Sequence, residues 1–428
     1  MTIGRPEGAP SKDARASVVV LVGTLISIYV ISQLLRNSIG VIAPDLAAEL
    51  ALSPPELGLL SSVFFFTFAI AQIPVGMALD RFGARKLLLA CVAATLVGIL
   101  LFAAASSATN LTLARALLGL GVTSFLVAPL SIYARRFPPH QFAMLASLQY
   151  GIGTTGTLLA TAPLAFLATA VGWRGSFLLI ALLTFLSGIL IAIVVREDDR
   201  WHAKPESLRE SLAGILAVLR APSIGPVFAI NLVFYSSFVL VVGLWGGPYL
   251  THVYGYGLEQ RGALLVIPVI AHIVGALLWG TMNRVMGGNK RPVLLGAGLT
   301  AAAFGYLAAV GKPSPLGIAV WLAVFGFVSA YVPLAVAHNR ALFPLALMGR
   351  GLTILNMGSM GGTFLVQLVS GIVIGLFAPA PDGAYPLAAY QTVFGLQAAF
   401  ILLACLAYSR AAEPAAESAT KVRPAPSA

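Results

Sequence analysis

Long apolar runs separated by short polar segments make up most of this chain. Twelve of these runs approach the roughly 20 residues that a helix needs to cross a bilayer. They lie at about 17–43, 57–79, 86–106, 110–133, 143–170, 175–195, 225–250, 261–282, 292–310, 315–337, 351–376 and 387–408. The pattern therefore predicts an all-α integral membrane protein with twelve transmembrane helices.

The longest polar interruption, residues 196–224, divides these runs into six and six. Apolar residues recur in it at helical spacing from Leu208 to Leu219, which predicts an amphipathic helix on the cytoplasmic membrane surface. We expect five parts: a cytoplasmic N-terminal segment (1–16), a first six-helix bundle (17–195), this connector (196–224), a second six-helix bundle (225–408) and a disordered cytoplasmic tail (409–428).

Composition and charge agree with a membrane location. The chain is 59% hydrophobic and 10% charged, with a mean hydropathy of +0.93, which excludes an ordinary soluble domain. If the N-terminus is cytoplasmic, the cytoplasmic segments hold all 26 basic residues except Arg36, Arg115, Arg174, Arg261 and Lys312. The positive-inside rule then places both termini in the cytoplasm, at a plasma membrane of the bacterial inner-membrane type. The +11 net charge is thus explained by basic residues that set the orientation of the protein among the membrane lipids, and we expect no nucleic-acid partner.

The two halves repeat one another at a nearly constant offset. Gly58 and Gly76 recur 204 positions later as Gly262 and Gly280. Three further residues recur 207 positions later: Gly119 as Gly326, Leu148 as Leu355, and Gln149 as Asn356. Agreement in order and offset predicts a duplicated unit, with a transport site at the interface between the halves.

A polar loop between the second and third runs contains Gly76, Asp80, Arg81, Gly83, Arg85 and Lys86. It resembles the signature cytoplasmic loop of the major facilitator superfamily, and residues 280–291 resemble a degraded copy. Arg115, Gly119 and Gly121 resemble a second motif of that superfamily. The resemblance covers about residues 17–408 and implies two six-helix bundles related by pseudo-two-fold symmetry that transport by alternating access.

These motifs suggest two roles. In the loop, Asp80 is placed to pair with a neighbouring bundle as a gating latch with Arg81 and Arg85; alternatively, the basic residues only set topology. Arg115 opens the fourth run close enough to the outer interface to snorkel, and either a coupling or a structural role remains open.

Arg36 lies inside the first run, whereas none of the 15 acidic residues lies inside any run. A charge at membrane depth is costly without a partner, so Arg36 is a candidate site for an external anion. Tyr29, Gln33 and Arg36 stand at i, i+4 and i+7 and share one helix face. This run is similar to the first helix of organophosphate and organic-anion transporters of the superfamily, which implies that Arg36 holds the substrate's anionic group.

The organophosphate pattern has a second arginine in the seventh helix, where this chain has Leu240. One cation favours a monoanion such as a carboxylate. Alternatively, Arg36 snorkels outward or pairs with Asp45 or a carbonyl. Further candidate substrate contacts, each of which could instead be an interhelical hydrogen bond, are Gln149, Tyr235 and Asn356.

His272 lies within the eighth run and could carry a coupling proton, or could simply pack there. The five histidines show no metal-ligand spacing, and no phosphate-binding loop or nucleophile–base pair is apparent. We therefore expect neither an enzyme nor a bound cofactor or metal.

The sequence favours a monomeric importer of a small organic anion, coupled to a proton or another cation. One rival is an exporter of drugs or siderophore-like compounds, although the fifth run lacks the Gly-Pro-x-x-Gly-Gly motif of drug antiporters. A remote rival is a membrane receptor derived from a transporter, although neither the connector nor the tail offers a folded output domain.

Overall fold

The computed structural model describes residues 12–196, 224–343 and 345–412, together with 216, 218 and 220. Most of the predicted amphipathic helix and most of the tail lie outside the described residues. The first half contains α1 Lys12–Asn37, α2 Ile39–Leu50, α3 Pro54–Phe82, α4 Ala84–Ala103, α5 Ala108–Gly121, α6 Ser124–Arg136, α7 Pro139–Gly153, α8 Thr155–Leu159 and α9 Ala162–Val194. The second half contains α11 Ile224–Leu240, the π-helix η1 Val241–Trp245, α12 Gly246–Tyr254, α13 Leu258–Trp279, α14 Met282–Met286, α15 Lys290–Val310, α16 Pro315–Val328, α17 Val332–Ala341, α18 Leu345–Gly375 and α19 Leu387–Tyr408.

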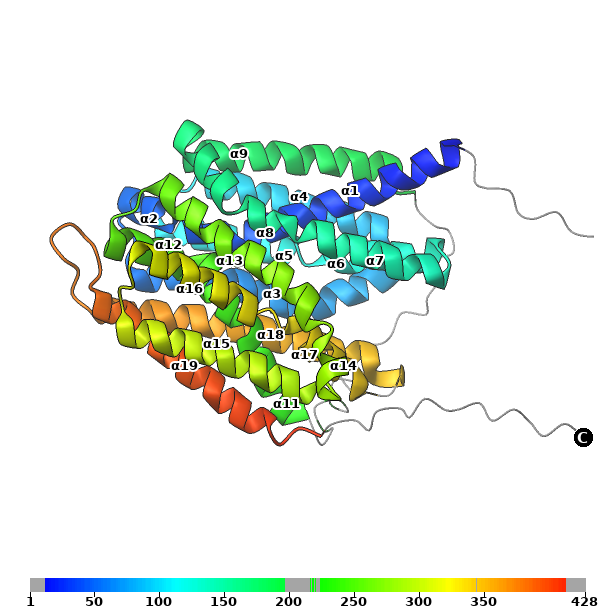
Figure 1. Ribbon diagram of the computed structural model, residues 1–428. Helices are drawn as coiled ribbons and strands as arrows, with labels where there is room; N and C mark the ends of the chain where they lie inside the picture. The colour runs from blue at the N-terminus through cyan, green and yellow to red at the C-terminus, as the bar shows by residue number, and fades with distance from the viewer. Residues whose placement is uncertain are drawn as a thin grey trace, which may run out of the picture.

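The long helices run side by side, and Figure 1 shows α1 beginning and α19 finishing at one end of the molecule. We call this the terminal end. Helices α2 and α12 and the segment 376–386 lie at the opposite end, which we call the far end. In the described part of the chain, eleven segments are helical, long and apolar enough to cross a membrane, against twelve predicted runs. Two consecutive helices separated only by a short break are counted here as one segment.

The fifth predicted run, 143–170, differs from expectation because it is divided among α7, α8 and the start of α9. A Cβ added to Gly153 would lie 1.9 Å from the Tyr29 ring, and one added to Gly156 would lie 2.1 Å from the Val30 carbonyl oxygen. The run therefore breaks where α1 packs against it. The first part of α9, which completes this run, ends at Gly172, where a φ of +73° interrupts the helix.

The repeated glycines occupy equivalent helix crossings, which explains their spacing in the sequence. A Cβ on Gly119 would lie 2.2 Å from the Phe64 carbonyl oxygen of α3, and a Cβ on Gly326 would lie 2.3 Å from the Pro268 carbonyl oxygen of α13. Gly58 packs on α18 and Gly262 on α9, so this second pair lies between the halves. Small residues at these positions allow close backbone approach in both repeats.

The first, fourth, seventh and tenth predicted runs each contain an interruption of the regular α-helix. The breaks lie at Ser38, at residues 122–123, at η1 and at residues 329–331. Discontinuous membrane helices expose backbone groups where they line a cavity or a binding site. All four interrupted runs contribute to the cavity described below.

The halves are closely joined at the far end. A Cβ on Gly40 of α2 would lie 1.9 Å from the Val242 carbonyl oxygen, and one on Gly247 of α12 would lie 2.0 Å from the Gly40 carbonyl oxygen. Beside this crossing, Arg261 of α13 donates to the Val41 carbonyl oxygen at 2.7 Å and pairs with the Asp45 carboxylate. Partial burial raises the pKa of Asp45, although Arg261 acts in the opposite direction.

Candidate functional site

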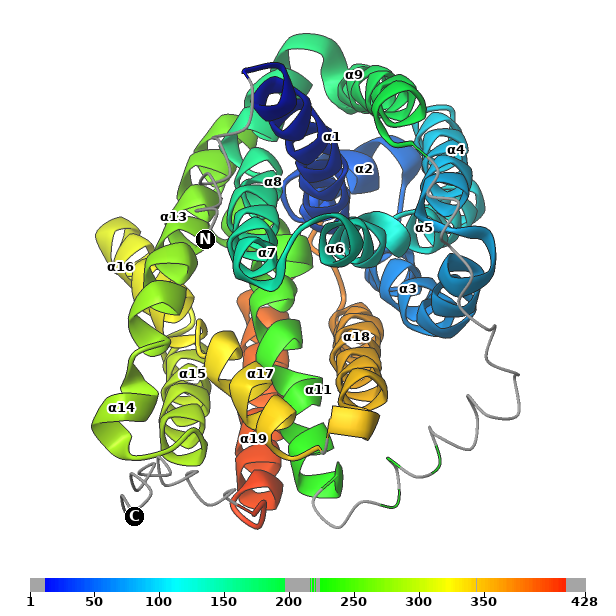
Figure 2. The same cartoon turned by 90° about the vertical axis from the view of Figure 1, so that its right-hand side faces the viewer.

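A cavity of about 280 Å³ lies between the two halves. Its wall combines residues of α1, α3, α6, α7, α8, α11, α13, α17 and α18 with the α5–α6 junction. Seen from the terminal end in Figure 2, α6 and α7 stand on one side of the molecule and α17 and α18 on the other. The predicted residues that line the cavity are Tyr29, Gln33, Arg36, Tyr235, His272 and Asn356.

Arg36 projects from the last turn of α1 and is only 8% exposed, so it does not snorkel outward. Its guanidinium carbon lies 4.7 Å from the ring centroid of Phe68, and Nη1 donates to the Tyr235 hydroxyl at 3.4 Å. Within the described residues no carboxylate pairs with it, because Asp45 pairs with Arg261 instead. Aromatic faces attract a cation without neutralising its charge, so Arg36 remains able to bind an anion.

Several buried polar atoms at this site lack hydrogen-bond partners among the described residues. They are Nε of Arg36 itself and, on neighbouring side chains, Ser32 Oγ, Gln33 Oε1 and Asn37 Oδ1. Asn37 is held by donation from Nδ2 to the Gln33 carbonyl oxygen at 2.9 Å and to Thr157 Oγ1 at 3.3 Å. Buried polar groups normally have partners, so this cluster is suited to a polar ligand. Sequence reasoning missed Ser32 and Asn37, although both are polar residues within an apolar run.

Arg115 differs from expectation because it is fully buried and cannot snorkel to the outer interface. Its Nη1 donates to the Leu35 carbonyl oxygen at 2.7 Å, and its guanidinium carbon lies 4.5 Å from the centroid of Phe64. A cation at the last carbonyls of a helix stabilises the helix end. Arg115 therefore fixes the last turn of α1, which carries Arg36.

Gln149 does not line the cavity, whereas its repeat partner Asn356 does. Gln149 is fully buried, donates from Nε2 to the Leu25 carbonyl oxygen at 3.0 Å and accepts from the Tyr133 hydroxyl at 2.9 Å. Asn356 is exposed and donates to Gln72 Oε1 at 3.1 Å. Equivalent positions in the repeat thus have different surroundings.

His272 lies on the wall contributed by the second half. Its ring centroid is 4.3 Å from that of Phe238, and Nδ1 is 3.3 Å from Ser329 Oγ, at the break between α16 and α17. The imidazole therefore faces the same cavity as Arg36 from the opposite half of the protein.

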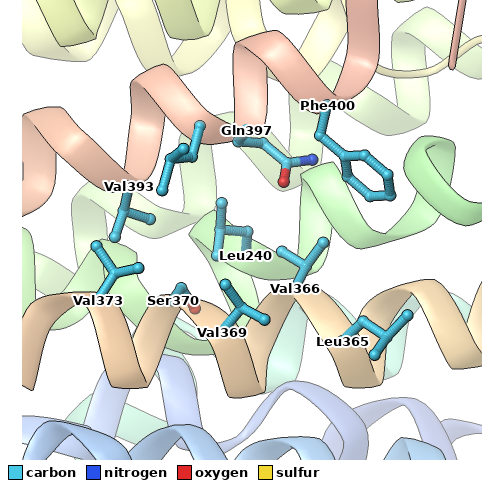
Figure 3. A pocket seen from close by; sticks show the side chains of 10 residues that line it. Leu240, Leu365, Val366, Val369, Ser370, Val373, Val393, Gln397 and Phe400 are labelled. Atoms are coloured by element: carbon cyan, nitrogen blue, oxygen red, sulfur yellow. The ribbon is translucent and has the colours of Figure 1, made fainter. Parts of the chain in front are cut away.

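Leu240, the counterpart of Arg36 by the 204-residue offset, faces a different and apolar pocket of about 320 Å³ between α11, α18 and α19 (Figure 3). The polar side chains in that pocket already have partners, because Ser370 Oγ accepts from the Trp245 indole at 2.7 Å and Gln397 donates to Ser237 Oγ at 2.9 Å. The second half therefore provides no cation equivalent to Arg36 at this position.

The signature loop forms the expected tight connection between α3 and α4. Gly83 joins them with a φ of +81°, a conformation that glycine adopts without strain. Arg85 donates to the Ala192 carbonyl oxygen of α9 at 2.9 Å, and the Arg81 guanidinium lies 5.4 Å from the Phe82 ring centroid. Gly76 is not sterically required, since an added Cβ would meet nothing within 4 Å.

The chain matches the Major Facilitator Superfamily over residues 25–262 and 246–427. It belongs to that superfamily. This membership confirms the superfamily indicated by the loop motifs and the all-α membrane fold class predicted from the apolar runs. A structure of a bacterial homologue of the human lysosomal transporter Spinster, in an inward-facing and unoccupied conformation, shares this superfamily fold, with a TM-score of 0.76 at 18% identity over 93% of this chain and 97% of the other.

Curated relatives of this superfamily member are named as transporters. A probable sulfoacetate transporter of Cupriavidus necator is 22% identical over 62% of the chain and 64% of its own length. A putative tartrate transporter of Agrobacterium vitis is 23% identical over 84% of the chain and 85% of its own length. The match to the first relative thus spans less than two thirds of that protein.

Proposed function

We propose that this protein is a secondary transporter that carries a small organic monoanion across the plasma membrane. The observation that carries the proposal is Arg36, a buried cation on the wall of a cavity between the halves, with no carboxylate partner in the described part of the chain. An arginine fork suits a carboxylate because it can donate two parallel hydrogen bonds. Tyr29, Gln33, Tyr235 and Asn356 line the same cavity and would contact the rest of the substrate.

The proposed charge follows from this chain rather than from its relatives. Sulfoacetate and tartrate each carry two acidic groups, and their transporters' names support an organic acid in general. Among the residues that the structure describes, the cavity wall contains one arginine and no lysine. One fixed cation balances one negative charge, which favours a monocarboxylate.

Alternating access would require the close contact at the far end to open while the terminal end closes. We place the terminal end in the cytoplasm, so the described conformation would open inward and the transporter would import its substrate as a monomer. Coupling to a proton or another cation completes the proposal, with His272 as the candidate carrier and Asp80, Arg81 and Arg85 as the cytoplasmic latch.

Counterflow into proteoliposomes tests the proposal without any assumption about coupling. We expect exchange of a labelled monocarboxylate, with phenylacetate and gluconate as probes, and loss of that exchange in Arg36→Gln. A hydrogen-bonded charge contributes about 1.5–3 kcal/mol, so binding should weaken about 10- to 100-fold. Arg410→Gln removes an exposed positive charge and serves as the matched control. Undiminished exchange by Arg36→Gln would overturn the assignment.

A further inference from the structure

Resting on the proposed function, we propose that the transported monocarboxylate has an apolar body, aromatic or branched aliphatic, rather than a hydroxylated one. The first half of the protein would hold its carboxylate and the second half its body. This narrows the substrate class of the same cavity and assigns a different task to each half.

Most polar residues of the cavity wall come from the first half and most apolar residues from the second, although the first half also contributes Phe68, Val122 and Leu126. On the first half, Arg36 lies among the unpartnered atoms of Ser32, Gln33 and Asn37. The second half presents mainly hydrocarbon from α11, α13 and α17. The apolar residues that it contributes include Phe234, Phe238, Val269, Ile273, Val332 and Val336.

Each polar side chain that the second half contributes to the wall already makes at least one contact within the protein. The Tyr235 hydroxyl accepts from Arg36, and Asn356 donates to Gln72. Ser359 Oγ donates to the Leu355 carbonyl oxygen at 3.1 Å, and His272 Nδ1 lies 3.3 Å from Ser329 Oγ. On this half a hydroxylated body would therefore exchange much of its water for contact with valine and phenylalanine side chains.

Energetics favour the apolar acid. In a hydrophobic pocket an added hydroxyl lowers apparent affinity by about 100-fold, and one methylene is worth about 10- to 200-fold. The cavity, at about 280 Å³, is also near the small end of the roughly 300–1,000 Å³ typical of ligand sites. A compact acid with one ring or a branched chain fits both constraints.

Equilibrium binding of phenylacetate and gluconate to the detergent-purified full-length protein tests this division. Both probes carry one carboxylate, so the comparison isolates the body. We expect phenylacetate to bind about 100-fold more tightly. Val336→Thr adds a hydroxyl to the apolar wall at nearly constant shape and should weaken phenylacetate binding about 10-fold, with no loss for gluconate.

Val324→Thr is the matched control, since Val324 is similarly exposed, at 50% against 44% for Val336, but does not line the cavity. Val332→Thr provides a second test on the same helix if Val336→Thr lowers the thermal midpoint. Gluconate binding that equals or exceeds phenylacetate binding, and that is lost in Arg36→Gln, would overturn the apolar body and leave the proposed function intact. Binding of both probes that is unaffected by Arg36→Gln would overturn both.

Discussion

At the scale of single residues, Arg36 is surrounded by aromatic rings and a hydroxyl instead of a carboxylate. Phe68 and Tyr235 provide favourable surroundings for a guanidinium and leave its charge uncompensated. An internal ion pair would have to be broken each time substrate entered, at a cost that can exceed the attraction gained. The arrangement therefore suits a site that must bind and release an anion repeatedly.

Arg115 supports this site indirectly, through its hydrogen bond to the Leu35 carbonyl oxygen. Arg115→Met keeps most of the side-chain volume but removes this charged donor, so that Ser38 Oγ, at 3.0 Å, remains as the side-chain donor to the Leu35 carbonyl oxygen. We expect the free energy of unfolding to fall by about 1–3 kcal/mol and phenylacetate affinity to fall with it. Thermal unfolding and binding titrations on the same samples would check this, with Arg115→Lys restoring part of both. Binding equal to that of the wild type in Arg115→Met would show that Arg115 does not position Arg36.

Some residues of the site follow from sequence and others do not. Helical spacing places Tyr29, Gln33 and Arg36 on one face, and all three line the cavity as predicted. Gln149 could not be assigned in this way, because its partner Tyr133 lies on α6 and only tertiary packing brings the two together. Phe68 carries no sequence signal, since phenylalanine is ordinary in an apolar run.

At the scale of helices, Gly40 and Gly247 allow α2 of the first half to pack closely against η1 and α12 of the second. Gly247→Ala would place a methyl group 2.0 Å from the Gly40 carbonyl oxygen, so the far end could not close without a shift. We expect this variant to favour the conformation that is open at the far end. Gly298→Ala, where an added Cβ meets nothing within 4 Å, is the matched control.

Accessibility of the cavity measures that shift directly. A cysteine at Thr154, on the cavity wall, would be placed in a protein whose Cys91 and Cys405 are replaced by serine. Gly247→Ala should raise its rate of reaction with a membrane-impermeant thiol reagent added from the far side about tenfold, whereas Gly298→Ala should not. Equal rates in the two variants would show that this crossing does not control access.

Helix positions were largely predictable, but most of their interruptions were not. Apolar runs mark the membrane helices because backbone groups in lipid must be satisfied within each helix. The break at residues 329–331 is marked locally by Pro333 at the start of α17, whereas the breaks at Ser38 and at residues 122–123 carry no comparable mark. The fifth run breaks where α1 packs on Gly153 and Gly156, a tertiary contact that no local pattern records.

At the scale of the whole molecule, the Asp45–Arg261 pair links the first half to the second at the far end. Asp45→Asn should weaken this link and increase the population open at the far end. Glu49→Gln is the control, because Glu49 pairs with Arg174 within the first half. The Trp173 indole and Arg174 both lower the pKa of Glu49, so Glu49 is ionised at neutral pH and the control removes a real charge.

Pulsed electron paramagnetic resonance can detect the opening. Spin labels at Ser106 and Ala378, which are exposed at the far end of the first and second halves, would report their separation. Asp45→Asn should populate a longer distance that Glu49→Gln does not. Identical distance distributions in the two variants would show that the pair does not hold the halves together.

The central claim is that Arg36 binds the negative charge of the substrate. It is tested most directly by thermal stabilisation of purified wild type and Arg36→Gln with phenylacetate, gluconate and their uncharged amides. A ligand at about 100 times its Kd stabilises the native state by about 2.7 kcal/mol. We predict that at least one carboxylate stabilises the wild type and that its amide does not. At the same concentration the acid should stabilise Arg36→Gln by only about 0.4–1.4 kcal/mol, because its Kd is about 10- to 100-fold higher in that variant. Equal stabilisation of both proteins, or of the wild type by acid and amide alike, would contradict the account.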